Sequence, residues 1–145
     1  MTAVRRHKPE NRAVDLSVSA ANTALLGKAF WSMVDEFQLS AEDQKAILGV
    51  ANRQTLHNLK RDLKISHSID GYRRVSLLLG IKTNLEILFP DAEIRSNWLH
   101  VARETFKGLS AVDFIKANAV ESQARLFTVR RLLDMLRSGS IPTLI

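Results

Sequence analysis

Apolar residues recur three and four positions apart along most of this chain, and this spacing constrains the fold more than any other feature. The pattern is most regular over residues 19–37, where one helical face is predicted to be buried: Leu25, Leu26, Ala29, Phe30, Met33, Val34 and Phe37. No segment alternates polar and apolar residues as a half-buried strand does, and no Asn-Gly pair marks a β-hairpin. The sequence therefore predicts an all-α fold.

Two short helices joined by a tight turn are predicted over residues 40–64. Ser40 and Asp43 have the spacing of a capping box, and the helix that they open is expected to end at Gly49. Asn52 is a favourable N-cap for the next helix. That helix carries three leucines expected to face inward: Leu56, Leu59 and Leu63. This order is typical of a helix-turn-helix, in which the second helix enters DNA.

The outer face of the second helix is the candidate DNA-binding surface. With the leucines inward, a rotation of about 100° per residue places four polar side chains on the opposite face: Gln54, His57, Asn58 and Arg61. Amide side chains pair with adenine edges and arginine with guanine, while Arg53 lies on the flank, where phosphates would be. The same residues also fit a helix face that is simply solvated. The turn GVAN is one residue longer than the commonest spacing, so the exact base contacts stay open.

Further helices are predicted toward the C-terminus. One begins near Gly71 and ends before Pro90, with Gly80 as a kink or a boundary between two shorter helices. Another surrounds Trp98 and is expected to stop near Gly108. The last long helix carries one apolar stripe: Leu126, Val129, Leu133 and Leu136. Both tryptophans are expected in the core.

Charge and composition narrow the classes of function. The 145 residues include 21 Lys and Arg against 15 Asp and Glu, a net charge of +6, which favours a polyanionic partner. Without cysteine there are no disulfides or thiolate metal ligands. The four histidines are scattered and no glycine-rich phosphate loop follows a strand, so we expect no enzyme, no metal and no cofactor. No apolar run would span a bilayer and no secretion signal is present, so we expect a cytoplasmic protein without membrane attachment.

Four segments in order resemble the Xre/MbcA/ParS family of antitoxins: LSAEDQKAILGVANRQTLHNL, YRRVSLLLGIKTNLEILFPD, NWLHVARETFKGLSAVDFI and TVRRLLDML. The resemblance spans about residues 20–138. Its most specific element is Trp98-Leu99, followed by Phe106, Gly108 and Leu109. One departure is Ala111, where the family commonly has proline. Proteins of this kind have an Xre-like helix-turn-helix followed by a small helical toxin-binding domain.

The resemblance implies an antitoxin of a type II toxin-antitoxin system. Such antitoxins bind a cognate RES-type toxin that acts on NAD, often form homodimers, and repress their own operon by binding operator DNA. Four regions are then expected: a basic, disordered N-terminal arm (1–16), a helix-turn-helix and dimerisation region (17–90), a helical toxin-binding domain (91–138) and a flexible apolar tail (139–145). Candidate toxin contacts lie in the last helix and the tail: Phe127, Arg130, Arg131, Ile141, Leu144 and Ile145.

Two alternatives stay open on the residues alone. The first is a helix-turn-helix transcriptional regulator that acts without a toxin. The second is a helical adaptor that binds protein and whose turn motif no longer touches DNA. Separately, the arginines of the last helix also fit ordinary surface charges, and the apolar tail also fits a frayed or core-docked terminus.

Overall fold

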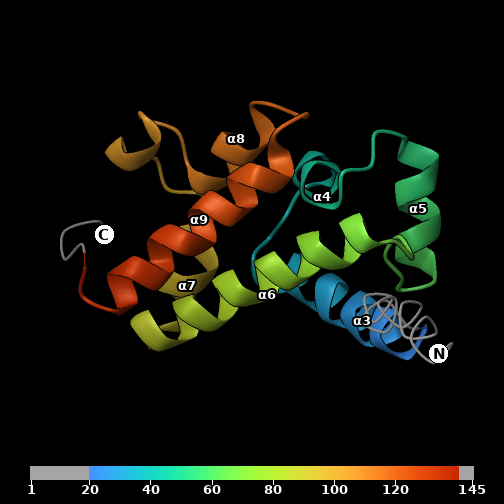
Figure 1. Ribbon diagram of the computed structural model, residues 1–145, viewed down its shortest axis with the longest axis horizontal. Coiled ribbons are helices and arrows are strands. Elements are labelled where there is room, and N and C mark those ends of the chain that lie inside the picture. Colours follow the sequence, from blue (N-terminus) through green and yellow to red (C-terminus); the bar gives the residue numbers. More distant parts are fainter. Residues whose placement is uncertain (1–19, 141–145) are drawn as a thin grey trace, which may run out of the picture.

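The computed structural model describes residues 20–140, and all regular structure in this range is helical (Figure 1). The elements are α3 (Ala20–Glu36), α4 (Ala41–Leu48), α5 (Arg53–Arg61), α6 (Ile69–Leu88), α7 (Ala92–Trp98), the 3-10 helix η2 (Glu104–Phe106), α8 (Ala111–Lys116) and α9 (Ser122–Arg137). The all-α prediction is confirmed for this part of the chain. None of these helices is both long and apolar enough to cross a membrane. The predicted N-terminal arm and the apolar tip of the tail lie outside the described residues.

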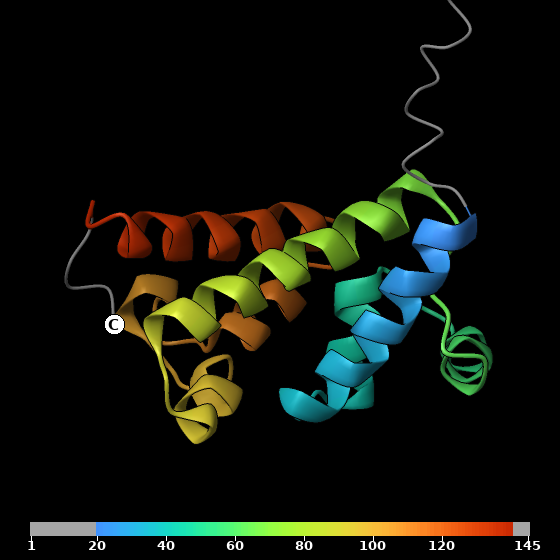
Figure 2. The ribbon, with the colours of Figure 1, turned by 90° about the horizontal axis from the view of Figure 1, so that it is seen from below.

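Helices α6 and α9 lie side by side and run in the same direction (Figures 1 and 2). Near their beginnings, the Gln123 amide donates a hydrogen bond to Asp70 Oδ1 at 2.7 Å. Near their ends, the Asn84 amide donates to Asp134 Oδ1 at 2.8 Å. Helices α7 and α8 with η2 therefore form the return path that carries the chain from the end of α6 back to its beginning.

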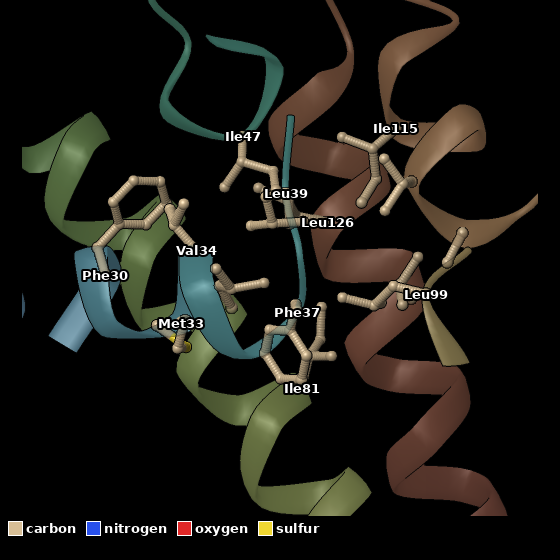
Figure 3. Close-up of a cluster of buried hydrophobic side chains, with 14 of the residues drawn as sticks. Phe30, Met33, Val34, Phe37, Leu39, Ile47, Ile81, Leu99, Ile115 and Leu126 are labelled. Atoms are coloured by element: carbon tan, nitrogen blue, oxygen red, sulfur yellow. The ribbon is translucent and has the colours of Figure 1, made fainter. Parts of the chain in front are cut away.

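A single cluster of buried apolar side chains holds the elements together (Figure 3). Every described element contributes to it, with one example from each in chain order: Phe30, Ile47, Leu56, Val75, Trp98, Phe106, Ile115 and Leu126. Full burial of a side chain of this size contributes about 1.5–3 kcal/mol before conformational entropy is counted. Residues before and after the boundary predicted at residue 90 thus share one core, and their division into two functional regions stays a prediction.

The start and stop signals predicted for α4 are confirmed. Ser40 Oγ accepts a hydrogen bond from the backbone N–H of Asp43 at 3.1 Å, and Asp43 Oδ2 accepts from that of Ser40 at 2.9 Å, which completes the capping box of α4. Gly49 ends α4 with φ +70°, a left-handed conformation that favours glycine. At the start of α8, Ser110 Oγ accepts a hydrogen bond from the backbone N–H of Asp113 at 3.0 Å. All four residues of the predicted α9 stripe are buried, and both tryptophans lie in the core.

Two predicted inward leucines are instead exposed. Leu63 follows the end of α5 with φ +53° and is 48% exposed, because the chain closes the helix at Arg61 with a Schellman motif. In this motif the Lys64 N–H donates to Leu59 O at 2.8 Å, and Leu63 N–H donates to Lys60 O at 3.1 Å. Leu25, on α3, is 68% exposed. The inner face of α3 is formed around Phe30 and lies away from Leu25.

Two predicted helix boundaries are also wrong. Helix α6 continues without interruption through Gly80, where the absence of a side chain leaves room for Arg130 of α9. Helix α7 ends at Trp98 and not near Gly108. The segment after Trp98 is held by side-chain contacts, since the Arg103 guanidinium stacks 4.3 Å over the Trp98 ring and donates to Trp98 O at 3.2 Å.

Candidate nucleic-acid and partner interfaces

Helix α5 lies at the edge of the molecule, at the opposite end from the end of α9 (Figure 1). Only Leu56 of this helix is buried, and Leu59 is half-buried against the core. Asn52 Oδ1 caps the helix by accepting from the backbone N–H groups of Gln54 at 2.7 Å and Thr55 at 3.1 Å. The rest of α5 is thus free to contact a partner.

The structure places all five predicted DNA-binding residues on the exposed surface of α5: Arg53, Gln54, His57, Asn58 and Arg61. Three of them form a hydrogen-bonded stripe. The Gln54 amide donates to Asn58 Oδ1 at 3.0 Å, and Arg61 Nη1 approaches the same oxygen at 3.5 Å. The stripe is thus arranged as the helical spacing predicts, although the predicted inward position of Leu63 was wrong.

Sequence reasoning missed the role of Asp62. Arg61 Nε donates to Asp62 Oδ1 at 3.1 Å and Nη2 donates to Oδ2 at 3.2 Å, so the carboxylate holds the guanidinium in a bidentate pair. This pairing raises the pKa of Arg61 and lowers the pKa of Asp62. Both groups are exposed, so solvent screens the pair and its net stabilisation is small. A base or phosphate that binds Arg61 must therefore compete with Asp62.

The C-terminal end of α5 is anchored to α3. Trp31 Nε1 donates a hydrogen bond to Lys64 O at 2.8 Å. Gly27 lies against the same segment, where a Cβ would stand 2.5 Å from Leu63 O. These contacts fix the end of the exposed helix against a buried part of the molecule.

The last turn of α4, which precedes the turn into α5, is connected to the core through Arg74. This side chain is 8% exposed, and its Nη1 donates to Ala46 O and Ile47 O in the last turn of α4, each at 3.3 Å. Its Nε donates to Asp70 Oδ2 at 2.8 Å. The four-residue spacing of Asp70 and Arg74 is typical of an ion pair within one helix, so this contact could be predicted from the sequence. The contact of Arg74 with α4 could not, because it joins residues 27 positions apart.

A shallow groove of about 400 Å³ separates part of α6 from α9. Its lining is formed by Tyr72, Arg73, Ser76, Leu77, Gln123, Ala124 and Phe127. Phe127 is 53% exposed, and Arg131, one turn further along α9, is exposed as well. Arg130 instead lies across Gly80, with its Nε 3.9 Å from Asp134 Oδ2. The other predicted toxin contacts, Ile141, Leu144 and Ile145, lie outside the described residues.

Within residues 20–140, no three His, Asp or Glu side chains gather as a metal site would require. The geometry in this range thus offers exposed surfaces for macromolecular contacts, namely the polar face of α5 and the groove beside Phe127.

The chain is similar to the uncharacterized protein y4oB of Sinorhizobium fredii (strain NBRC 101917 / NGR234). The two are 32% identical over 112 residues, which covers 77% of this chain and 84% of y4oB. This chain belongs to the same family as y4oB. No family model and no solved structure matches the chain. Because y4oB is uncharacterized, membership of its family assigns no activity to this chain.

Proposed function

We propose that this member of the y4oB family is a DNA-binding antitoxin. In this proposal α5 binds operator DNA, and the face of α9 around Phe127, together with the C-terminal tail, binds a RES-type toxin and keeps it inactive. The observation that carries the proposal is the exposed stripe Gln54, Asn58 and Arg61 on a helix that follows a tight turn. The resemblance of the sequence to Xre/MbcA/ParS antitoxins supports the assignment of the partner.

The stripe has the chemistry required for readout in the major groove. Gln54 and Asn58 each present an amide that can pair with an adenine edge, and Arg61 can donate two hydrogen bonds to guanine. Around the stripe, exposed basic side chains are placed to contact phosphates: Arg53, Lys60 and Lys64. The dipole of α5 also favours a phosphate at the N-terminal end of the helix.

As a homodimer, the protein would place two copies of α5 in successive major grooves. The centres of the two half-sites would then lie about 34–36 Å apart on one side of the duplex. An operator overlapping its own promoter would make the protein a repressor of its own operon.

The toxin-binding surface is proposed on α9. Phe127 offers an exposed aromatic ring, and Arg131 lies about 40° from it around the helix, since residues four apart share a face. Exposed aromatic side chains and arginines are the residue types that most often dominate binding energy at protein interfaces. The tail from residue 139 onward is the second proposed contact.

DNA binding is tested with the fragment upstream of the gene at one fixed salt concentration. We expect Gln54→Ala and Arg61→Ala each to cost about 1–3 kcal/mol of operator affinity and to relax base preference at one position. Arg137→Ala is the control, because this exposed arginine lies at the far end of α9 and its loss removes the same charge as Arg61→Ala. Operator affinities of the α5 variants equal to that of the control would exclude readout by this face.

Toxin binding is tested by co-expression with the neighbouring reading frame. Phe127→Ala and deletion of residues 139–145 should weaken rescue from growth arrest while leaving operator binding intact. Val120→Ala is the control, since Val120 is also exposed but lies in the turn before α9. If no neighbouring frame arrests growth, the antitoxin assignment is wrong, and a DNA-binding regulator without a toxin becomes the better description.

A further inference from the structure

The buried guanidinium of Arg74 joins three helices. From α6 it donates to two carbonyls in the last turn of α4, and its Nη1 also donates to Ser122 Oγ, at the first residue of α9, at 2.8 Å. Asp70 Oδ2 accepts a hydrogen bond from Nε of the same guanidinium. One side chain thus connects segments that are 27 and 48 residues away in sequence.

The end of α4 is shaped around this guanidinium. The last carbonyls of a helix lack partners within the helix and carry the negative end of its dipole, so a buried cation is favourable there. Gly49, the next residue, has φ +70°, and a Cβ on it would stand 2.7 Å from Arg74 Cζ. Glycine is therefore required at this position both by the backbone and by the arginine that lies against it.

The turn at residues 49–52 sets the direction in which α5 leaves α4. At about 1.5 Å per residue, Arg61 lies about 13 Å along the helix from this turn. Because Trp31 holds the far end of α5 at Lys64 O, a tilt of about 10° about that end would move the residues beside the turn by about 2 Å, more than a base-specific hydrogen bond tolerates. Small changes at Arg74 should thus have large effects on recognition.

The other end of the network lies at the groove between α6 and α9. Ser122 Oγ donates to Ala119 O at 3.1 Å, and Gln123 of the groove donates to Asp70, which is the same carboxylate that holds Arg74. The first turn of α9 and the end of α4 therefore share one continuous set of hydrogen bonds.

We propose that Arg74 is a positioning residue for DNA recognition, which fixes the direction of α5 through the end of α4 and makes it depend on the first turn of α9. This inference rests on the DNA-binding function proposed above. Arg74 is buried and lies apart from the exposed face of α5, so we expect its loss to affect sequence preference and not general attraction to phosphates.

The test compares the full chain with Arg74→Met, Arg74→Lys and Ser122→Ala on the upstream fragment and on a scrambled fragment of equal length. We expect Arg74→Met to weaken operator binding about tenfold or more and scrambled-DNA binding by less than about twofold. The operator affinity of Arg74→Lys should lie between those of the wild type and Arg74→Met, because an ammonium keeps the charge but cannot replace the planar guanidinium. Ser122→Ala, which removes a single hydrogen bond on α9, should weaken operator binding about threefold.

Arg137→Met is the matched control, which removes an exposed positive charge at the far end of α9. It should change the affinity for both fragments by the same factor. Hydrogen exchange of the DNA-free protein gives a second readout. Amides of residues 50–58 should exchange faster in Arg74→Met and Ser122→Ala than in the wild type or Arg137→Met.

The outcomes separate the two proposals. If the wild type does not prefer the upstream fragment over the scrambled one, the DNA-binding proposal fails, and the exchange of residues 50–58 alone decides whether Arg74 fixes α5. If Arg74→Met does not fold, the operator affinity and hydrogen exchange of Ser122→Ala decide whether Arg74 positions α5. The positioning role would be overturned if Ser122→Ala and every folded Arg74 variant kept two properties of the wild type. These are its preference for the upstream fragment and its hydrogen exchange at residues 50–58.

Discussion

Alanine substitutions at two helical glycines should differ in their effect on stability: Gly27→Ala should destabilise the protein, and Gly80→Ala should not. In a helix interior alanine is about 1 kcal/mol more favourable than glycine, so both variants begin with the same gain. At Gly27 the new methyl group would stand 2.5 Å from Leu63 O and 3.0 Å from Lys64 Cα. At Gly80 it would instead meet the Arg130 side chain, with Cδ at 2.7 Å. Displacing backbone atoms costs more free energy than displacing a long side chain, which can rotate away.

The expected magnitudes follow from these neighbours. In Gly27→Ala, overpacking costs about 1–3 kcal/mol, and loss of the Trp31 hydrogen bond to Lys64 O adds about 1 kcal/mol. After the helix gain, a net destabilisation of about 1–3 kcal/mol remains. In Gly80→Ala, the displaced Arg130 gives up a half-exposed ion pair worth less than about 1 kcal/mol, so the variant should be neutral or up to about 1 kcal/mol more stable.

The measurement is urea or thermal unfolding followed by circular dichroism. For a domain of this size about 1 kcal/mol corresponds to a shift of about 4 °C in Tm. Ala24→Gly, at an exposed position of α3, measures the helix-propensity term by itself. Gly27→Ala should also weaken operator binding, because it moves the anchored end of α5. Equal Tm values for the two glycine variants would refute the close approach of α3 to Leu63.

Three further predictions concern the core, a helix cap and an ion pair. Leu133→Ala removes a fully buried side chain of α9 and should cost about 2–5 kcal/mol in urea unfolding, and a loss below about 1 kcal/mol would contradict its burial. Asn52→Ala removes the cap of α5 and should cost about 1 kcal/mol and lower operator affinity, while unchanged stability would show that the cap is replaced by water. Lys116 Nζ lies 2.8 Å from the buried Asp43 Oδ1, and this contact raises the pKa of Lys116 above its usual 10.5. Its stabilisation is therefore complete below pH 10.5 and is lost as pH rises through the folded pKa, so the stability gap between wild type and Lys116→Met should shrink in that range.

The features that the sequence predicted well depend on neighbouring residues. The capping box of Ser40 and Asp43, the stop at Gly49 and the cap at Asn52 each involve atoms within a few residues, so their geometry follows from local chemistry. The exposed polar face of α5 follows from the helical period of the same short segment. These signals therefore correctly predicted that the polar face of α5 is exposed, while its role in DNA binding stays a prediction.

The features that the sequence missed depend on contacts between distant segments. Nothing beside Gly80 shows that Arg130, 50 residues later, will lie across it, and the same holds for Arg74 and Ser122. Leu63 was expected inside because its period matches Leu56 and Leu59, but the helix ends at Arg61 and the buried position is taken by Ile65. Which side chains meet and which are buried is decided here by tertiary packing and by where a helix ends. The period of apolar residues carries no information on either.

The parallel pairing of α6 and α9 has a consequence for recombination within the gene and for proteolysis of the protein. A recombination break or a protease cut near residue 90 would separate the two helices and leave core side chains of α6, such as Val75 and Leu85, without part of their cover. The half that carries α5 would unfold along with the half that carries α9. A chain break between the two halves should therefore destabilise both of them, because they share one core.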